Sequence, residues 1–517
     1  MNSSTEAAKP IFTSVVDMLE AAAETVPYGE ALVFGKERYD YGQYRSCVIS
    51  LIRELDPTRV AGKRVATVLP NSAFACAAML AVMGSGAQLV PLNPAYTTRE
   101  LEYMLRDSEP AAVVVCDDLV DAVAKLVEPL GNVRIVAESA WARQMPQWSG
   151  LRSGPLRPAT HPDRLAMLQY TGGTTGKPKG VSLTHDSIAF NVSQREGILP
   201  SRHDVERVLC AVPLFHSYGM GMGLFLSLYA RGCLVILPRY HPTEMLSIVE
   251  SERITVLPGN PTIYVGLMSH ERFGATDWSA MHRCYSGSAP LPQPVLERWR
   301  ERTGSVIYEG YGQTEAGSIL TYNPLDRPRQ GSVGVALPGT EIEIVDVESG
   351  ERALGVGERG EIRARGPQIM RGYLNQPEAT AATLRGGWLH TGDIGEFDAD
   401  GYLYIRDRKK DLVIVGGYNV YPREIEEVLF EHRAVIDAAA VGVADAYRGE
   451  VIRAFVVVDP LAGIGEAELL KHCRKNLAKY KVPSSITLLD ALPKTGVNKT
   501  DKQALRARAT GAGQGQD

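Results

Sequence analysis

Short apolar runs rich in β-branched residues alternate with helical patterns over most of the chain, from Ala31 to about Tyr404. Arg64–Leu69 and Ala111–Cys116 are typical of buried strands, whereas the apolar residues of Arg99–Arg106 recur with the period of a helix. This alternation predicts an α/β fold of packed sheets and helices. Because a single hydrophobic core stops growing at roughly 250–300 residues, a chain of 517 residues is expected to divide into domains.

A charged run, Arg406–Asp411, separates two unlike regions and is the predicted linker. Such a run ordinarily lies on a solvated surface. Before it, Trp388–Arg406 predicts a hairpin, because Asp400-Gly401 favours a tight turn between its two strand-like runs. After it, Asp411–Val415 predicts a strand, Pro422 opens a predicted helix, and Glu466–Tyr480 has the pattern of an amphipathic helix. We therefore expect a large N-terminal domain over 1–406, a hinge over 407–411 and a small α+β C-terminal domain over 412–517.

Composition excludes several function classes. A net charge of −5 gives no reason to expect nucleic-acid binding. The seven cysteines lie far apart, without metal-ligand or redox spacing, which is typical of free thiols in the cytoplasm. The longest apolar stretches, Ala73–Met83 and Gly219–Ala230, are shorter than the roughly 20 residues that span a bilayer. We expect two buried helices there, no transmembrane segment and, at the N-terminus, no signal peptide.

The segment Tyr170–Gly180 (YTGGTTGKPKG) carries the strongest chemical signal. Its glycines let the backbone approach a phosphate, its hydroxyls and amides donate hydrogen bonds, and its lysines add charge. It is not a Walker A loop, because Gly172 stands one position too close to Gly176 and Pro178 follows Lys177. The expected phosphate-binding residues are Thr171, Gly172, Gly173, Thr174, Thr175, Gly176, Lys177 and Lys179.

This pattern resembles the phosphate loop of the adenylate-forming superfamily, which includes acyl-CoA synthetases, firefly luciferase and the adenylation domains of peptide synthetases. The resemblance runs from about residue 12 to residue 506. The further motifs, in the family's order, are Pro213–Gly219 (PLFHSYG), Tyr285–Leu291 (YSGSAPL), Tyr311–Glu315 (YGQTE), Gly360–Tyr373, Trp388–Asp393 (WLHTGD), Arg408–Glu426 and Leu492–Thr500 (LPKTGVNKT). The resemblance implies ATP-dependent activation of an organic acid as an acyl-adenylate, and transfer of the acyl group to coenzyme A.

Several residues are expected to bind the nucleotide or its metal ion. Tyr311 offers a ring face to adenine, and Glu315 offers an oxygen ligand to Mg²⁺, although Thr314-Glu315 could instead cap a helix. The resemblance implies that Asp393 and Arg408 contact the ribose and that Thr174 accompanies Glu315 at the metal. It adds Ser288, Ala289, Pro290, Gly312, Gln313 and Thr314 to the nucleotide site. We assign Gly360–Tyr373 to structure alone.

The resemblance also names the catalytic and acyl-binding residues. Lys499 holds the position of the catalytic lysine, with Asn498 where the family usually has glycine; asparagine tolerates left-handed backbone better than most residues. With Glu315 and His216, which would lie beside the substrate carboxylate, it forms the expected catalytic set. The acyl pocket is expected at His216, Gly219, Gly287 and Ser288. Lys410 would be the hinge residue of a mobile C-terminal domain, and Gly416 and Gly417 would line the path of coenzyme A.

The acid itself is less constrained. Phe215-His216-Ser217 supplies no carboxylate for a substrate ammonium, and Gly219–Leu228 is apolar. We therefore expect a fatty, alicyclic or aromatic acid. One alternative is an acyl-AMP ligase that loads an acyl carrier protein, although the chain shows no obvious inserted segment. Another is a malonyl-type ligase in which Arg283 pairs with a second carboxylate; otherwise Arg283 would be a surface residue.

Overall fold

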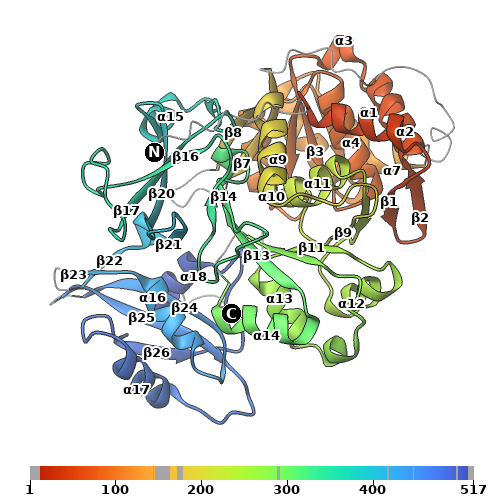
Figure 1. The fold of residues 1–517 in the computed structure, drawn as a ribbon. Helices are drawn as coiled ribbons and strands as arrows, with labels where there is room; N and C mark the ends of the chain where they lie inside the picture. Colours follow the sequence, from red (N-terminus) through yellow and green to blue (C-terminus); the bar gives the residue numbers. More distant parts are fainter. Residues whose placement is uncertain are drawn as a thin grey trace.

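The computed structural model describes residues 12–143, 145, 156, 164–171, 178–287, 291–415, 418–445, 448–495 and 499–510. The fold is mixed α/β, with a large N-terminal and a smaller C-terminal domain (Figure 1). Four sheets form in these described residues, three of them before residue 411 and the fourth after it.

Two large sheets form the body of the N-terminal domain. One has the order β18 (Gly372–Tyr373), β8 (Lys179–Thr184), β7 (Leu165–Thr171), β4 (Gln88–Leu92), β3 (Arg64–Val68), β5 (Ala112–Val115) and β6 (Arg134–Ala137). The other has the order β15 (Val335–Ala336), β14 (Thr321–Tyr322), β13 (Val306–Tyr311), β12 (Arg283–Ser286), β11 (Val256–Gly259), β9 (Arg207–Cys210), β10 (Cys233–Ile236), β1 (Glu30–Phe34) and β2 (Glu37–Asp40). The central strands of both sheets are parallel, as the alternating pattern predicts.

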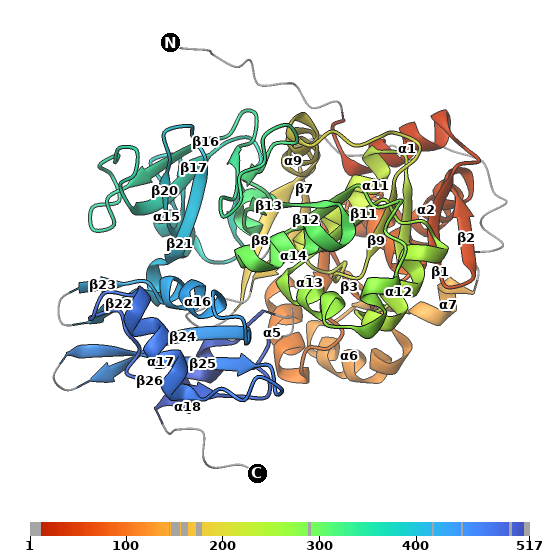
Figure 2. The same ribbon diagram turned by 60° about the horizontal axis from the view of Figure 1, so that its bottom comes forward.

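Helices fill the space between these sheets and cover their outer faces. The inner layer contains α1 (Val15–Thr25), α2 (Tyr41–Leu55), α4 (Ala73–Gly84), α9 (His185–Ile198) and α11 (Leu226–Tyr229). On the outer faces lie α5 (Thr98–Ser108), α6 (Val120–Val127), α12 (Pro242–Ser251), α13 (Pro261–Met268) and α14 (Gln293–Thr303) (Figure 2). Shorter helices are α3 (Pro57–Val60), α7 (Glu138–Ala142) and α15 (Pro377–Thr383). Every residue of α4 is buried, which explains why its sequence is apolar all round.

The second apolar stretch is buried as expected, but it is not one regular helix. It comprises α10 (Ser217–Gly219), a π-helical segment η3 (Met220–Phe225) and α11. Gly219 ends α10 just before the π-helical segment, and a Cβ there would overlap the Pro213 carbonyl. The glycine is therefore required by a close backbone approach. Single π-helical turns are frequent at functional sites.

The predicted hairpin is confirmed. It pairs β20 (Trp388–Phe397) with β21 (Leu403–Arg408) in an antiparallel sheet that also contains β16 (Glu341–Val345), β17 (Gly360–Arg365) and β19 (Leu384–Arg385). The charged run Arg406–Asp411 begins within β21 and is only partly solvated, because Arg408 and Lys410 are exposed whereas Asp407 and Asp411 are buried. Asp407 accepts backbone hydrogen bonds from Arg408 and Arg423, and Asp411 pairs with Arg506. These bonds satisfy carboxylates that would otherwise be costly to bury.

The C-terminal sheet contains β22 (Val413–Val415), β23 (Tyr418–Val420), β24 (Val435–Asp445), β25 (Gly449–Val458) and β26 (Ser485–Leu488), and it packs with α16 (Pro422–Phe430), α17 (Glu466–Asn476) and α18 (Lys502–Ala509). One predicted strand and one predicted helix were too long. The strand begins at Val413 because Lys409–Asp411 form a 3₁₀ turn, and α17 stops at Asn476, after which Leu477 is extended. No helix in the described parts of the chain is long and apolar enough to cross a bilayer.

Candidate active site

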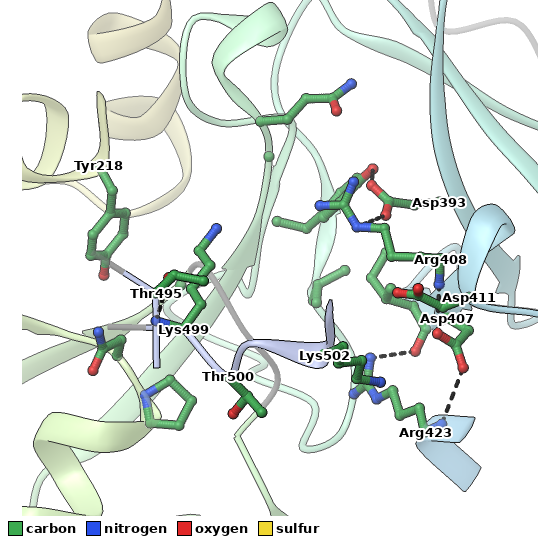
Figure 3. Close-up of a pocket in the computed structure, with 18 of the residues that line it drawn as sticks. Tyr218, Asp393, Asp407, Arg408, Asp411, Arg423, Thr495, Lys499, Thr500 and Lys502 are labelled. Atoms are coloured by element: carbon green, nitrogen blue, oxygen red, sulfur yellow. Dashed lines mark hydrogen bonds and ion pairs between the residues drawn. The ribbon is translucent and has the colours of Figure 1, made fainter. Parts of the chain in front are cut away.

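A cavity of about 1990 Å³ opens where the edges of the large-domain sheets meet the small domain. The carboxyl ends of β7, β12 and β13 contribute to its wall, as is usual for ligand sites in open parallel sheets. The opposite wall comes from β21, α16 and the C-terminal loop that carries Lys499 (Figure 3).

Asp393, Arg408 and Tyr311 form a bonded group on one side of the cavity. Asp393 and Arg408 face each other across β20 and β21, and Arg408 Nε lies 2.8 Å from Asp393 Oδ1. The Tyr311 hydroxyl donates to Asp393 Oδ2 over 2.6 Å. Burial raises the pKa of Asp393, while Arg408 and Tyr311 lower it. The structure therefore brings together three residues expected to bind nucleoside, with the carboxylate oriented before any ligand binds.

Lys499 reaches the same cavity from the small domain. Figure 3 shows its side chain between Tyr218 on one side and Arg408 and Asp393 on the other. Burial and the positive charge of Arg408 lower the pKa of Lys499 to about 8, although Asp393 and Glu315 act in the opposite direction. Lys499 and Glu315, which are far apart in the sequence, are therefore close enough to influence each other electrostatically.

His216 is a neutral residue at this site. Burial, with a smaller contribution from Lys499, lowers its pKa to about 3. The backbone N–H of Tyr218 donates to His216 Nδ1 over 3.2 Å, so the imidazole proton is on Nε2. His216 therefore offers one hydrogen-bond donor to the cavity, not a positive charge.

Glu315 lies in a 3₁₀ turn, Thr314–Ala316, that follows β13. The residue before this turn makes no side-chain capping bond, and the Glu315 carboxylate accepts a 2.8 Å hydrogen bond from the Tyr373 hydroxyl. Lys179 Nζ lies 4.9 Å from the centroid of the Tyr373 ring. The helix-cap alternative is therefore not what this geometry shows. Tyr373 is a contact that the sequence interpretation missed, since it assigned Gly360–Tyr373 to structure alone.

The remaining predicted residues divide into three groups. Thr171, Gly287, Gly312, Gln313, Thr314 and Lys410 line the cavity, and a Cβ on Gly287 would overlap the Tyr218 ring. Gly219 is buried and is not among the lining residues that the structure describes. The predicted residues outside the described ranges are Gly172, Gly173, Thr174, Thr175, Gly176, Lys177, Ser288, Ala289, Pro290, Gly416 and Gly417.

Both expectations for Arg283 were wrong. Its side chain is only 5% exposed, and its guanidinium donates to the Pro200 carbonyl. It lies on β12, and within the described chain it is not part of the cavity wall. Arg283 therefore stabilises the fold around residue 200 and has no access to a substrate carboxylate. The cysteine beside it, Cys284, is buried as predicted.

Two large sheets around a shared helical layer, with a small domain closing over their common edge, define the class of adenylate-forming α/β enzymes. The chain belongs to the AMP-binding enzyme family, whose model matches residues 19–374. The model of the AMP-binding enzyme C-terminal domain matches residues 424–499.

Named relatives agree with this placement. A long-chain-fatty-acid–CoA ligase of Bacillus subtilis is 37% identical over 487 residues, which are 87% of this chain and 86% of that protein. The anthranilate CoA ligase AuaEII, solved with anthranoyl-AMP, is 27% identical, with a TM-score of 0.89 over 97% of this chain and 98% of that one.

ATP-bound MatB from Rhodopseudomonas palustris is 32% identical, with a TM-score of 0.87 over 96% of this chain and 98% of that one. The apo structure of MatB, at the same identity, gives a TM-score of only 0.77. Because sequence identity and the share of this chain covered are the same in the two comparisons, the difference is one of geometry. The present arrangement of the chain is therefore nearer to that of the ATP-bound structure.

Proposed function

We propose that this protein is an AMP-forming carboxylic acid–CoA ligase that acts through an acyl-adenylate. The observation that carries the proposal is the position of Lys499, a small-domain residue, in the cavity that holds His216, Glu315 and Asp393 of the large domain. An anionic acid must meet the α-phosphate of ATP, so the reaction needs positive charge and alignment at that point.

The described residues suit the two steps. In the first, a carboxylate oxygen bonds to the α-phosphorus, and the bond to pyrophosphate breaks. Lys499 would neutralise charge at the phosphate, His216 would donate from Nε2 to the acid, and Asp393 with Arg408 would hold the ribose. In the second, the coenzyme A sulfur bonds to the acyl carbon and the bond to AMP breaks, with loss of the thiol proton to solvent.

A magnesium ion fits the phosphate side of the cavity. Mg²⁺ keeps several waters and takes one or two carboxylates together with substrate phosphates. Glu315 supplies one such carboxylate in the cavity wall, and the described residues contain no group of three or more His, Cys, Asp or Glu that could hold a metal ion by itself. We propose that Glu315, with Thr174 of the phosphate loop, would hold the ion, whose charge would offset that of the phosphates.

The second step requires that Lys499 leave and coenzyme A enter. We propose that residues 407–411 separate domains 1–406 and 412–517 and that the small domain turns about Lys410, which is exposed. Gly416 and Gly417 are proposed to border coenzyme A on the basis of the motif. The seven cysteines are free thiols, which supports the cytoplasm as the compartment.

The wall around His216 favours an apolar monocarboxylic acid. The uncharged residues that line the cavity together with His216 include Phe215, Tyr218, Gly287, Ser318 and Ile319. A free amino acid or a dicarboxylate would need a charged partner there, and burying an unpaired charge is costly. The name of one relative, a long-chain-fatty-acid–CoA ligase, supports the same class.

The test is a panel of fatty, alicyclic, aromatic, amino and dicarboxylic acids with Mg²⁺-ATP, with and without coenzyme A. We expect AMP and pyrophosphate with apolar monocarboxylic acids, and a thioester when coenzyme A is present. ADP as the product would refute the reaction class. If acyl-adenylate forms but only a phosphopantetheinylated carrier protein accepts the acyl group, the protein is an acyl-AMP ligase.

A further inference from the structure

Tyr373 connects two charged residues at the phosphate side of the cavity, and we propose that it is a positioning residue for both. Its hydroxyl donates to Glu315 Oε1 over 2.8 Å, and its ring lies 4.9 Å from Lys179 Nζ. Glu315 is the proposed magnesium ligand, and Lys179 ends the phosphate-binding segment. The inference thus rests on the proposed function and adds a residue to which that function gave no role.

The backbone around Tyr373 is held on both sides. Strand β18 pairs with β8, where Tyr373 lies opposite Val181, and Leu374 N donates to the Gly180 carbonyl over 2.8 Å. On the other side, Tyr373 N donates to Thr380 Oγ1 over 2.9 Å. The tyrosine therefore has a fixed position relative to Lys179, which is the first residue of β8.

The same segment also fixes the turn that carries Glu315. Met370 N donates to the Glu315 carbonyl over 2.8 Å, so the segment from Met370 to Leu374 connects the 3₁₀ turn to β8. These backbone bonds set the separation of Glu315 and Lys179, and the Tyr373 side chain determines how the two charged groups point.

This placement has a physical consequence for a metal–nucleotide complex. A carboxylate has about four acceptor positions, so one hydrogen bond at Oε1 orients the group and leaves sites for a metal. The aromatic face attracts the Lys179 ammonium, so this ammonium and the Glu315 carboxylate each contact a different part of the Tyr373 side chain. Without Tyr373, the two groups could pair with each other, and neither would then be available to a phosphate or a metal.

Two substitutions separate the hydroxyl from the ring. ATP binding is measured by calorimetry without an acid, first in EDTA and then over a series of Mg²⁺ concentrations. For Tyr373→Phe we expect unchanged ATP affinity in EDTA and a Mg²⁺ requirement raised about 10–100-fold, as is usual when a group that orients a metal ligand is removed. For Tyr373→Leu we expect ATP affinity in EDTA to fall as well, by roughly 2–30-fold, because Lys179 loses its aromatic partner.

Tyr402→Phe is the matched control. The Tyr402 hydroxyl donates to the Arg327 carbonyl over 2.6 Å, and Arg329 lies 4.1 Å from the centroid of its ring, but Tyr402 is outside the described cavity wall. We expect this variant to bind ATP and Mg²⁺ like the parent protein. Thermal unfolding of all three variants without ligands reports whether each is folded.

The outcomes are distinct. If Tyr373→Phe, while folded, has the parental Mg²⁺ requirement, or loses ATP affinity equally with and without Mg²⁺, the positioning role is wrong. An equal change in Tyr402→Phe would also overturn it. If the parent protein binds Mg²⁺-ATP with the expected dependence on Tyr373 but adenylates no acid, the proposed function fails and the role of Tyr373 stands.

Discussion

The two ends of the cavity are constructed differently. At the ribose end, Asp393, Arg408 and Tyr311 come from three strands of the large-domain sheets and bind one another at 2.6–2.8 Å. At the reaction end, Lys499 comes from a loop of the small domain and bonds locally through its backbone, whose N–H donates to Thr495 Oγ1 and whose carbonyl accepts from Thr495 N. Among the described residues, its ammonium forms neither an ion pair nor a hydrogen bond.

This difference has a chemical meaning. A carboxylate that must bind ribose hydroxyls through both steps benefits from a rigid setting prepared during folding. A cation that must act in one step and then leave should not be bound tightly to a protein carboxylate, because that bond would have to break each time. In the proposed mechanism, the ribose end is therefore a fixed site, and the reaction end is completed by domain placement.

The largest expected effect comes from removing the positive charge of Lys499. Lys499→Ala should lower adenylate formation by roughly 10²–10³-fold or more, since charge-stabilising groups are often worth that much. It should still convert supplied acyl-adenylate and coenzyme A into thioester. The half-reactions are measured separately, by pyrophosphate release and by thioester formation.

Lys494→Ala is the control for this substitution. Lys494 is on the same loop, but its ammonium is already paired with Asp437 at 2.8 Å. We expect this variant to keep most of its adenylation rate. If Lys499→Ala slowed both half-reactions equally, Lys499 would not be specific to adenylation, and the proposed difference between the two ends of the cavity would be wrong.

A substitution at the ribose end of the cavity should slow both half-reactions. Asp393→Asn removes the charge that pairs with Arg408, and hydrogen bonds to charged groups are worth about 1.5–3 kcal/mol. ATP binding should therefore weaken by about 10–100-fold, and thioester formation from acyl-adenylate should weaken with it. Asp400→Asn, on the same hairpin but 65% exposed and paired with Arg329, should change neither. A loss confined to adenylation would contradict a site used in both steps.

The pH dependence of kcat/KM for ATP should follow the titration of Lys499 in the free enzyme. Its pKa is lowered to about 8, and the protonated form is the active one, so kcat/KM for ATP should be constant well below pH 8 and fall about tenfold per unit above it. Bound phosphates favour the ammonium, so the corresponding fall in kcat should occur at higher pH. Lys499→Arg keeps its charge and should lack this alkaline fall, whatever its maximal rate. An unchanged fall in that variant would assign it to another group.

A smaller effect is expected from breaking the contact between Arg359 and α16, which joins the large domain to the small domain. Arg359 of the large domain bonds to Glu396 at 2.8 Å and to Glu424 of α16. Such partly exposed pairs contribute about 0.2–1 kcal/mol. Arg359→Ala should therefore slow adenylation about two- to fivefold and leave thioester formation unchanged. Arg365→Ala, which breaks a pair with Glu341 within the large domain, should slow neither step.

Local patterns predicted much of the fold correctly. The strands β3 and β5, the helix α5 and the hairpin of β20 and β21 each depend on residues close in sequence. The errors occurred where distant segments decide the outcome. Asp407 and Asp411 seemed solvated until Arg423 and Arg506 supplied their partners, and Arg283 seemed exposed until the Pro200 carbonyl covered it.

The site shows the same division. The sequence by itself determined which residue types are available for the chemistry, because each motif is a contiguous segment whose loop geometry and charge are local properties. Only the tertiary structure decided that Lys499 enters the cavity of His216 and Glu315, and that Tyr373 orients Glu315 beside Lys179. Those contacts join residues far apart in the chain, and their positions are set by how the sheets and the small domain pack.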